Sequence, residues 1–157
     1  IKEPQNYEAR ANLMWASSMA LNTVLDAGTV HDCACHMMEH EVSAYYDITH
    51  GHGLAIITPR WLEYILNNDT AEPIYRLGRR VFDIESGLGK TDGAKKTIEA
   101  LSKFCFESLG LKSTFSELGI DSAHFREMAE HSCHGGVLHG LETLKPDDVE
   151  NIYKMCL

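Results

Sequence analysis

The sequence predicts an all-α fold, and three of its features support that prediction. Apolar residues recur mostly at three- and four-residue steps, the alternation typical of strands is scarce, and glycines, prolines and capping residues divide the chain into segments of helical length. The 157 residues suit one domain with its own core, and no repeat, low-complexity segment or linker divides them. We therefore expect a single helical domain over residues 1–157.

Seven stretches have the periodicity and the boundary residues of helices. They are residues 8–26, 31–46, 54–66, 72–85, 92–109, 121–131 and 146–155. Gly28 is the stop signal of the first stretch, and residues 47–49 break the second. Gly51 and Gly53 are expected to flank a turn before the third stretch, inside which Pro59 should kink or restart the helix.

The remaining boundaries follow from capping preferences. Residues 67–70 form a loop with good capping side chains before the fourth stretch, and Gly110 closes the fifth. Residues 114–119 are expected to form a short turn, and Asp121 to cap the sixth helix. Pro146 and two aspartates stand in the first turn of the last helix, where proline and acidic residues are favoured.

Composition excludes several classes of protein. The formal net charge of −9 would repel phosphate backbones, so we expect no nucleic-acid partner. No apolar run approaches the roughly 20 residues of a membrane span, and no signal peptide opens the chain, so no membrane partner is expected. The five cysteines are an odd number at irregular spacing, and Cys33 and Cys35 do not form a Cys-x-x-Cys motif. Reduced thiols in a cytoplasmic protein are therefore expected.

A group of histidines is the most informative feature of the sequence. His36 and His40 are four residues apart and therefore share one face of a helix. His50 follows the end of that helix, beside glycines that let the chain turn back. Neutral imidazole is the commonest protein ligand for metals such as zinc and Fe(II), so the three side chains could converge on one ion. On spacing alone the alternative, a chance pair with His36 half-buried in the core, stays open.

The pattern His36-x3-His40-x9-His50-Gly, followed by an apolar run that ends in Pro59, resembles the signature of the iron-dependent alcohol dehydrogenases. Within that family, the spelling Tyr-Asp-Ile-Thr-His-Gly of residues 46–51 is most similar to the bacterial butanol dehydrogenase branch. The motif is specific, because it fixes the spacing of three histidines as well as their surroundings.

The resemblance extends beyond this motif. Residues 7–18 resemble the first helix after that family's cofactor domain, and residues 147–149 and 152–153 resemble its last helix. The resemblance thus covers nearly the whole chain. It implies the multi-helix C-terminal domain of the dehydroquinate synthase-like, iron-containing alcohol dehydrogenase fold.

The resemblance also implies a role for each histidine. In that family the residues matching His36 and His50 bind a divalent metal, Fe(II) or sometimes Zn(II). The residue matching His40 lies beside the metal and the nicotinamide of NAD(P)H, and it is assigned to proton transfer or to shaping the cofactor pocket. The implied activity is the interconversion of small primary alcohols and aldehydes, with His40 as a catalytic and cofactor-binding residue.

The same family takes its other two metal ligands, an Asp and a His four residues apart, from an earlier helix, and holds the dinucleotide on a Gly-rich turn. This sequence has no candidate for either feature before His31, and it opens with Ile1 instead of Met. We therefore expect an N-terminal nucleotide-binding domain upstream and no activity in this chain alone. The face toward that domain should be apolar and exposed, which favours a homo-oligomer.

Several residues near the histidines have two possible roles. His52 stands where relatives often carry a Glu or an apolar residue, and it either points into the site or faces solvent. Glu39 and Glu41 either orient the imidazoles or lie on a solvated helix face.

Two further clusters are less informative. One near the C-terminus has a spacing that could suit zinc, although no closed four-ligand pattern is visible, and it is expected to be a mobile connection. Its members are His131, Cys133, His134 and His139. The other cluster is expected to be the solvated face of a helix. Its members are Arg76, Arg79 and Arg80.

Two rival functions remain. One is a non-catalytic helical interaction domain with fortuitous histidines. The other follows from the doublet His31-Asp32, which suggests the phosphohydrolases that bind metal through a His and a His-Asp doublet. That class also needs an earlier His on a preceding helix, and none precedes His31.

Overall fold

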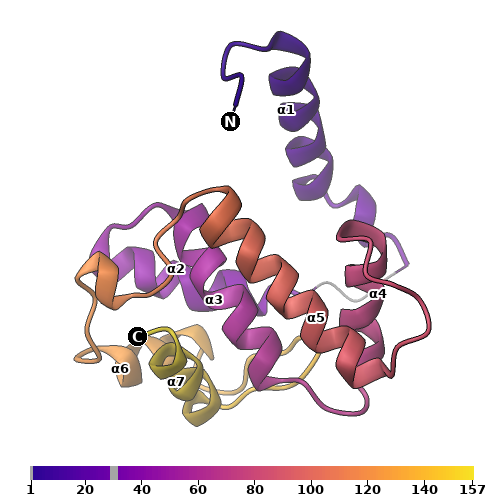
Figure 1. Cartoon of the computed structure of the whole chain (residues 1–157). Coiled ribbons are helices and arrows are strands. Elements are labelled where there is room, and N and C mark those ends of the chain that lie inside the picture. Colours follow the sequence, from indigo (N-terminus) through magenta and orange to yellow (C-terminus); the bar gives the residue numbers. More distant parts are fainter. Residues whose placement is uncertain (1, 29–31) are drawn as a thin grey trace. The chain divides into compact units, whose positions relative to one another are not determined.

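The computed structural model describes residues 2–28 and 32–157, and over these ranges its regular elements are helices apart from one isolated β-bridge between Leu138 and Leu144 (Figure 1). The α-helices are α1 (Tyr7–Leu21), α2 (Ala34–Tyr46), α3 (His50–Tyr64), α4 (Ala71–Val81), α5 (Lys90–Lys103), α6 (Phe125–Ser132) and α7 (Pro146–Met155). The shorter elements are the 3-10 turns η1 (Val24–Asp26) and η3 (Ser116–Leu118) and the π-helical turn η2 (Phe104–Ser108). The prediction of an all-α fold is confirmed.

Contacts divide the chain into two compact units, residues 1–32 and residues 33–157. The first unit contains α1, whose N-terminus is capped by the side-chain oxygen of Asn6, which accepts a hydrogen bond from the backbone N–H of Ala9 (3.0 Å). The sequence predicts this helix to run to residue 26, but it ends at Leu21 because Thr23 adopts a left-handed φ of 67°.

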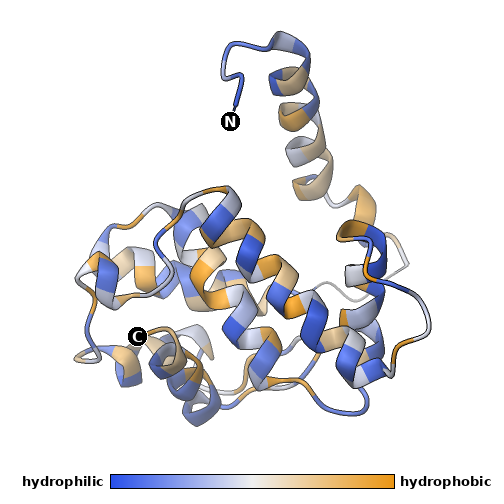
Figure 2. Ribbon diagram, viewed as in Figure 1, coloured by the Kyte–Doolittle hydropathy of each residue, from blue (hydrophilic) through white to orange (hydrophobic). Residues whose placement is uncertain are grey.

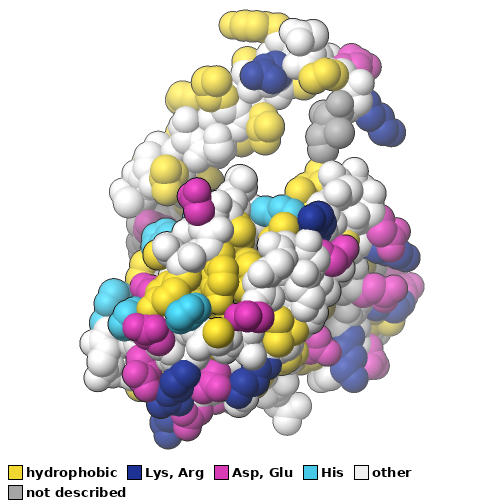
Figure 3. Space-filling model, turned by 90° about the vertical axis from the view of Figure 1, so that its left-hand side faces the viewer, with side chains coloured by type: hydrophobic (Ala, Val, Ile, Leu, Met, Phe, Trp, Pro, Cys, Tyr) yellow, Lys and Arg dark blue, Asp and Glu magenta, His cyan; other side chains and the backbone are white. Residues whose placement is uncertain are grey.

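Large apolar side chains of this first unit are exposed. Orange segments of the α1 ribbon in Figure 2 mark hydrophobic residues, and Figure 3 shows hydrophobic side chains in yellow on the molecular surface. They are Tyr7, Leu13, Met14, Trp15, Leu21, Val24 and Leu25. α1 has no buried residue of its own. A helix that is apolar without burial is unusual in a soluble protein, so this unit presents a surface suited to contact with other protein.

The core of the second unit forms where α2 packs against α3 and α6, α7 against α3 and α6, and α5 against α3 and α4. Its largest fully buried apolar side chains are Tyr153, Phe115, Phe125, Met38, Ile56, Ile57, Ile74, Met128, Ile152, Val42 and Val149. The buried Tyr153 hydroxyl donates a hydrogen bond to the backbone carbonyl of Met38 (2.8 Å). This bond satisfies the one polar atom of the side chain and ties α7 to α2.

The start of α3 differs from the prediction. Gly51 and Gly53 do not flank a turn, because both lie inside α3, which begins at His50. The helix also continues through Pro59, where a kink or restart was expected. Packing of α3 against α2, α5 and α7 therefore overrides the low helix propensity of three residues in one helix.

Other boundaries are mixed. The last helix has the bounds that the sequence predicts. The prediction that Asp121 caps the sixth helix is wrong, because α6 begins at Phe125 and the Asp121 carboxylate accepts a hydrogen bond from Ala123 N (3.0 Å) in the preceding turn. The predicted fifth helix ends as the π-helical turn η2.

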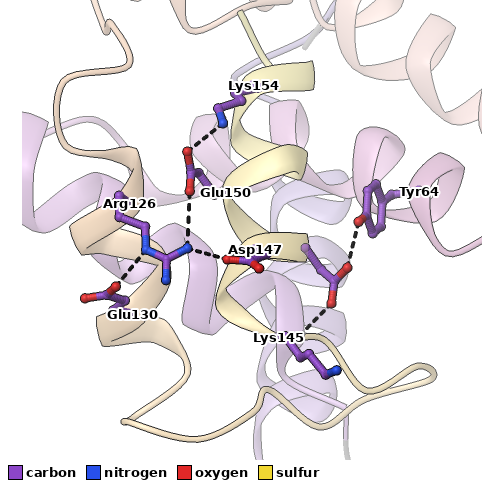
Figure 4. Close-up of polar contacts among 8 residues, drawn as sticks. Tyr64, Arg126, Glu130, Lys145, Asp147, Glu150 and Lys154 are labelled. Carbon is purple, nitrogen blue, oxygen red and sulfur yellow. Dashed lines mark hydrogen bonds and ion pairs between the residues drawn. The ribbon is translucent and has the colours of Figure 1, made fainter.

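The N-terminus of α7 is held by side chains from two other segments (Figure 4). Asp148 accepts a hydrogen bond from the backbone N–H of Lys145 (2.8 Å) and another from the Tyr64 hydroxyl at the end of α3 (2.7 Å). Arg126 on α6 lies among three carboxylates, those of Glu130, Asp147 and Glu150. Two of these carboxylates, Asp147 and Glu150, belong to α7, so the contacts connect α6 to α7. Exposed ion pairs of this kind are individually weak.

Cys105, Cys133 and Cys156 are free thiols in the structure, in line with the prediction from the sequence. Cys105, Cys133 and Cys156 are buried, whereas Cys33 and Cys35 are half-buried. None of the helices in the described residues is both long and apolar enough to cross a membrane.

The thiol of Cys156 should make the fold sensitive to alkali. Burial raises its pKa from 9.0 to about 12, so its contribution to stability is complete below the unfolded-state pKa and is lost as the pH rises toward 12. The unfolding free energy of the wild type should fall between about pH 7.5 and about pH 10. In Cys156→Ala, which lacks the thiol, this fall should be smaller by about 1.4 kcal/mol. Urea unfolding at the two pH values measures this difference. The same pH dependence in both proteins would contradict it.

Candidate metal centre

Three histidines converge where α2 meets the first residue of α3. His36 and His40 lie one turn apart on α2, and His50 opens α3. One ring nitrogen from each side chain lies within 4.8 Å of those of the other two, and the ring centroids are 5.1 to 6.2 Å apart. The structure thus brings together the three histidines that the sequence singles out.

The spacing of two of these nitrogens fits a shared metal ion. Nitrogen ligands lie about 2.0–2.1 Å from a bound zinc. Two such ligands on one ion, at bond angles from octahedral to tetrahedral, are therefore about 2.8–3.4 Å apart. Nδ1 of His36 lies 3.1 Å from Nε2 of His50, within that range. The His40 side chain is exposed beside them.

A buried carboxylate stands behind His50. The Glu39 side chain is fully buried, and one of its oxygens, Oε2, contacts Nδ1 of His50. Its other oxygen, Oε1, accepts a hydrogen bond from the Ser43 hydroxyl (2.6 Å), one turn further along α2. Of the two roles that the sequence leaves open for Glu39, the structure therefore favours orientation of an imidazole over a solvated helix face.

A glycine makes room for this carboxylate. A Cβ atom at Gly53 would lie 2.7 Å from Cγ of Glu39, closer than real Cβ contacts. The absence of a side chain at this position lets the first turn of α3 approach α2 at Glu39. Sequence reasoning missed this function of Gly53, because a glycine four residues after a predicted helix break is typical of a turn.

His52 lies outside the three-histidine group. Its Nε2 is 3.0 Å from the backbone carbonyl of Lys112, in the segment between η2 and η3. His52 therefore does not join the other imidazoles. It contacts the protein backbone instead and links the first turn of α3 to this segment.

The cluster near the C-terminus is not assembled as a metal site. His131 and His134 line an open hollow of about 470 Å³ with Glu41 and Glu130, and Nδ1 of His131 lies 3.4 Å from a Glu41 oxygen. Among the described residues, however, His36, His40 and His50 form the group of three potential ligands that lie close enough to share an ion. Cys133 is buried, and Glu41 faces His131.

The arginines of α4 form a solvated face, as predicted. Arg76 and Arg80 are exposed, and Arg79 stacks over the Tyr75 ring (4.6 Å) while it donates to Glu72 (2.8 Å). The doublet proposed for a phosphohydrolase includes His31, which lies outside the described residues.

Comparison with known proteins identifies the family. A family model described as "Fe-containing alcohol dehydrogenase family, C-terminal" matches residues 1–157. The chain belongs to this family. The NADH-dependent butanol dehydrogenase A of Clostridium acetobutylicum is 43% identical over 156 residues, which are 98% of this chain and 40% of that protein. The NADPH-dependent aldehyde reductase of Escherichia coli is 36% identical over 137 residues, 83% of this chain and 34% of that protein.

Solved structures of the family share the fold. The NADH-dependent butanol dehydrogenase A of Thermotoga maritima superposes with a TM-score of 0.84 at 32% identity, covering 98% of this chain and 40% of that one. The Escherichia coli aldehyde reductase gives a TM-score of 0.81 at 30% identity, covering 99% of this chain and 41% of the other. The chain spans about 40% of the length of these relatives. The predicted C-terminal domain fold is confirmed.

Substitution of the two glycines of α3 tests the close approach of the helices. Gly53→Ala should lower the unfolding free energy by about 1–3 kcal/mol, because its Cβ would press on Glu39. Gly51→Ala is the matched control, since no atom lies within 4 Å of its added Cβ, and it should be neutral or stabilising by up to ~1 kcal/mol. Thermal or urea unfolding measures both variants. Equal effects would argue against the contact.

Proposed function

We propose that this chain is the metal-binding part of an NAD(P)-linked alcohol dehydrogenase that interconverts small primary alcohols and aldehydes. The observation that carries the proposal is the 3.1 Å approach of a His36 nitrogen to a His50 nitrogen, in a chain of the Fe-containing alcohol dehydrogenase family. The printed activities of its relatives, butanol dehydrogenases and an aldehyde reductase, support the substrate class.

His36 and His50 are the proposed ligands for Fe(II) or Zn(II). Imidazole nitrogen suits either ion, and the spacing of the two nitrogens fits ligands of one ion. A divalent metal held there would supply Lewis-acid polarisation of the substrate oxygen. The two helices that carry the ligands hold them before any ion binds, because His36 lies on α2 and His50 lies on the first turn of α3.

His40 is the proposed catalytic residue. Its imidazole is exposed, and its ring centroid lies 5.2 Å from that of His50 and 6.2 Å from that of His36. It can therefore border a bound nicotinamide and take or return the proton of the alcohol oxygen at one ring nitrogen. NAD(P)H would supply the hydride, which is chemistry of the cofactor and not of the protein.

The cofactor domain is proposed to come from outside these 157 residues. An Asp and a His of that domain would complete the metal site, and its Gly-rich turn would hold the dinucleotide. The exposed apolar side chains of α1 support a contact with other protein, either that domain or a second copy in a cytoplasmic homo-oligomer. Both compact units would then belong to one helical metal-binding domain.

Alanine substitutions in the enzyme that contains this chain test the roles of the three histidines. His36→Ala and His50→Ala should each lower metal content and activity together, because each removes one ligand of a small set. His40→Ala should keep the metal and reduce turnover by about 10²–10⁴-fold, the usual effect of losing a general acid–base group. Metal analysis and steady-state kinetics measure both effects. If His40→Ala removed the metal while His36→Ala did not, the assigned roles would be wrong.

The chain by itself provides a second test. We expect a folded helical protein that self-associates and has no dehydrogenase activity. It should bind divalent metal weakly, because its histidines provide only part of the coordination shell and water must complete it. Circular dichroism, light scattering, metal titration and an assay with either nicotinamide measure these properties. Adding the nucleotide-binding domain of the same polypeptide should restore activity. Full activity without it, or none after its addition, would favour the alternative of a non-catalytic interaction domain.

A further inference from the structure

Glu39 is the one fully buried carboxylate beside the candidate metal centre. Its side chain has no exposure, although it stands one residue from the exposed His40. In the described part of the chain its polar partners are Ser43 and His50, and no lysine or arginine pairs with it. Burial of a charged group is costly unless the group is paired and hydrogen-bonded, so this placement requires a reason beyond packing.

The environment of Glu39 fixes the direction of each oxygen. Oε1 is occupied by the Ser43 hydroxyl at 2.6 Å. Oε2 is therefore left to face Nδ1 of His50. Gly53 closes the other side, because its missing side chain leaves space that the carboxylate fills. The carboxylate of Glu39 is thus enclosed between α2 and α3, and its Oε2 is oriented toward Nδ1 of His50.

We propose that Glu39 is a positioning residue that holds His50 as the tautomer protonated on Nδ1, with its Nε2 lone pair directed toward His36 and the candidate metal centre. The Nδ1–H group donates to the carboxylate, since a carboxylate oxygen can only accept there. Nε2 is then an acceptor, and it faces Nδ1 of His36 at 3.1 Å. A histidine side chain in water prefers the opposite tautomer, with the proton on Nε2, so the carboxylate changes which nitrogen can bind an ion.

The consequence for the metal rests on the proposed function. A carboxylate behind a ligating imidazole fixes the ring orientation and raises its basicity, and loss of such a partner typically lowers metal affinity by about 10–100-fold. The same loss should be seen here if His50 is a ligand. The tautomer, in contrast, is a property of the metal-free chain and does not depend on the enzyme's activity.

The first experiment determines the tautomer of His50 by long-range ¹H–¹⁵N NMR on the metal-free chain, at a pH where the imidazoles are neutral. In the wild type we expect the proton on Nδ1. Glu39→Met should return the ring to the tautomer that a histidine side chain prefers in water, with the proton on Nε2. Glu39→Gln, which keeps the shape and one acceptor oxygen, should give a mixture. Glu41→Gln is the matched control, because this neighbouring carboxylate faces His131, and it should leave His50 unchanged.

A proton on Nε2 of His50 in the wild type would overturn the proposal. So would an unchanged tautomer in Glu39→Met with circular dichroism showing the wild-type helix content, and the wild-type measurement keeps the test decisive if this variant fails to fold.

A second experiment titrates Co(II) into the same four proteins. Wild type and Glu41→Gln should bind alike, and Glu39→Met should bind about 10–100-fold more weakly. If Co(II) binds the wild type and the Glu39 variants equally, the positioning role fails while the metal site stands. If no protein binds Co(II) although the tautomer depends on Glu39, the metal site fails while the positioning role stands.

Discussion

The contact between α2 and the first turn of α3 at Glu39 is the constraint on which the candidate centre depends. Gly53 lets the backbone of α3 reach the buried carboxylate, and His50 then falls beside it. Met38 and Val42 of α2 and Ile56 and Ile57 of α3 are all fully buried in the same core, so the two helices are held by packing on the side away from the histidines. A densely packed interior deforms little, which keeps the imidazoles in a fixed relation.

Helix α7 supports this arrangement through hydrogen bonds to both helices. α7 is bonded to α2 through the Tyr153 hydroxyl and the Met38 carbonyl, and to α3 through Asp148 and Tyr64. Burial raises the pKa of Tyr153 well above its usual value, which keeps the phenol neutral and able to donate. Functional side chains are positioned more precisely when they are carried by helices supported in this way than when they are carried by loops.

The proposed function, in which further ligands and a cofactor come from outside this chain, draws on two exposed surfaces. His36 and His40 are exposed, and so are the large apolar side chains of α1. Family membership and the length of the relatives agree with that arrangement. In the proposed function this chain supplies metal ligands and an acid–base group, and NAD(P)H held by the partner domain supplies the hydride.

The sequence by itself determined the all-α class, the bounds of α7 and the histidine motif, because these follow from periodicity, capping residues and spacing along one helix. Local signals failed at Gly51 and Gly53, where they predicted a turn at residues that lie inside one helix. The position of Glu39 behind His50 also needed the tertiary structure. Eleven residues separate the two along the chain, and only the packing of α2 on α3 decides which side chain a buried carboxylate meets.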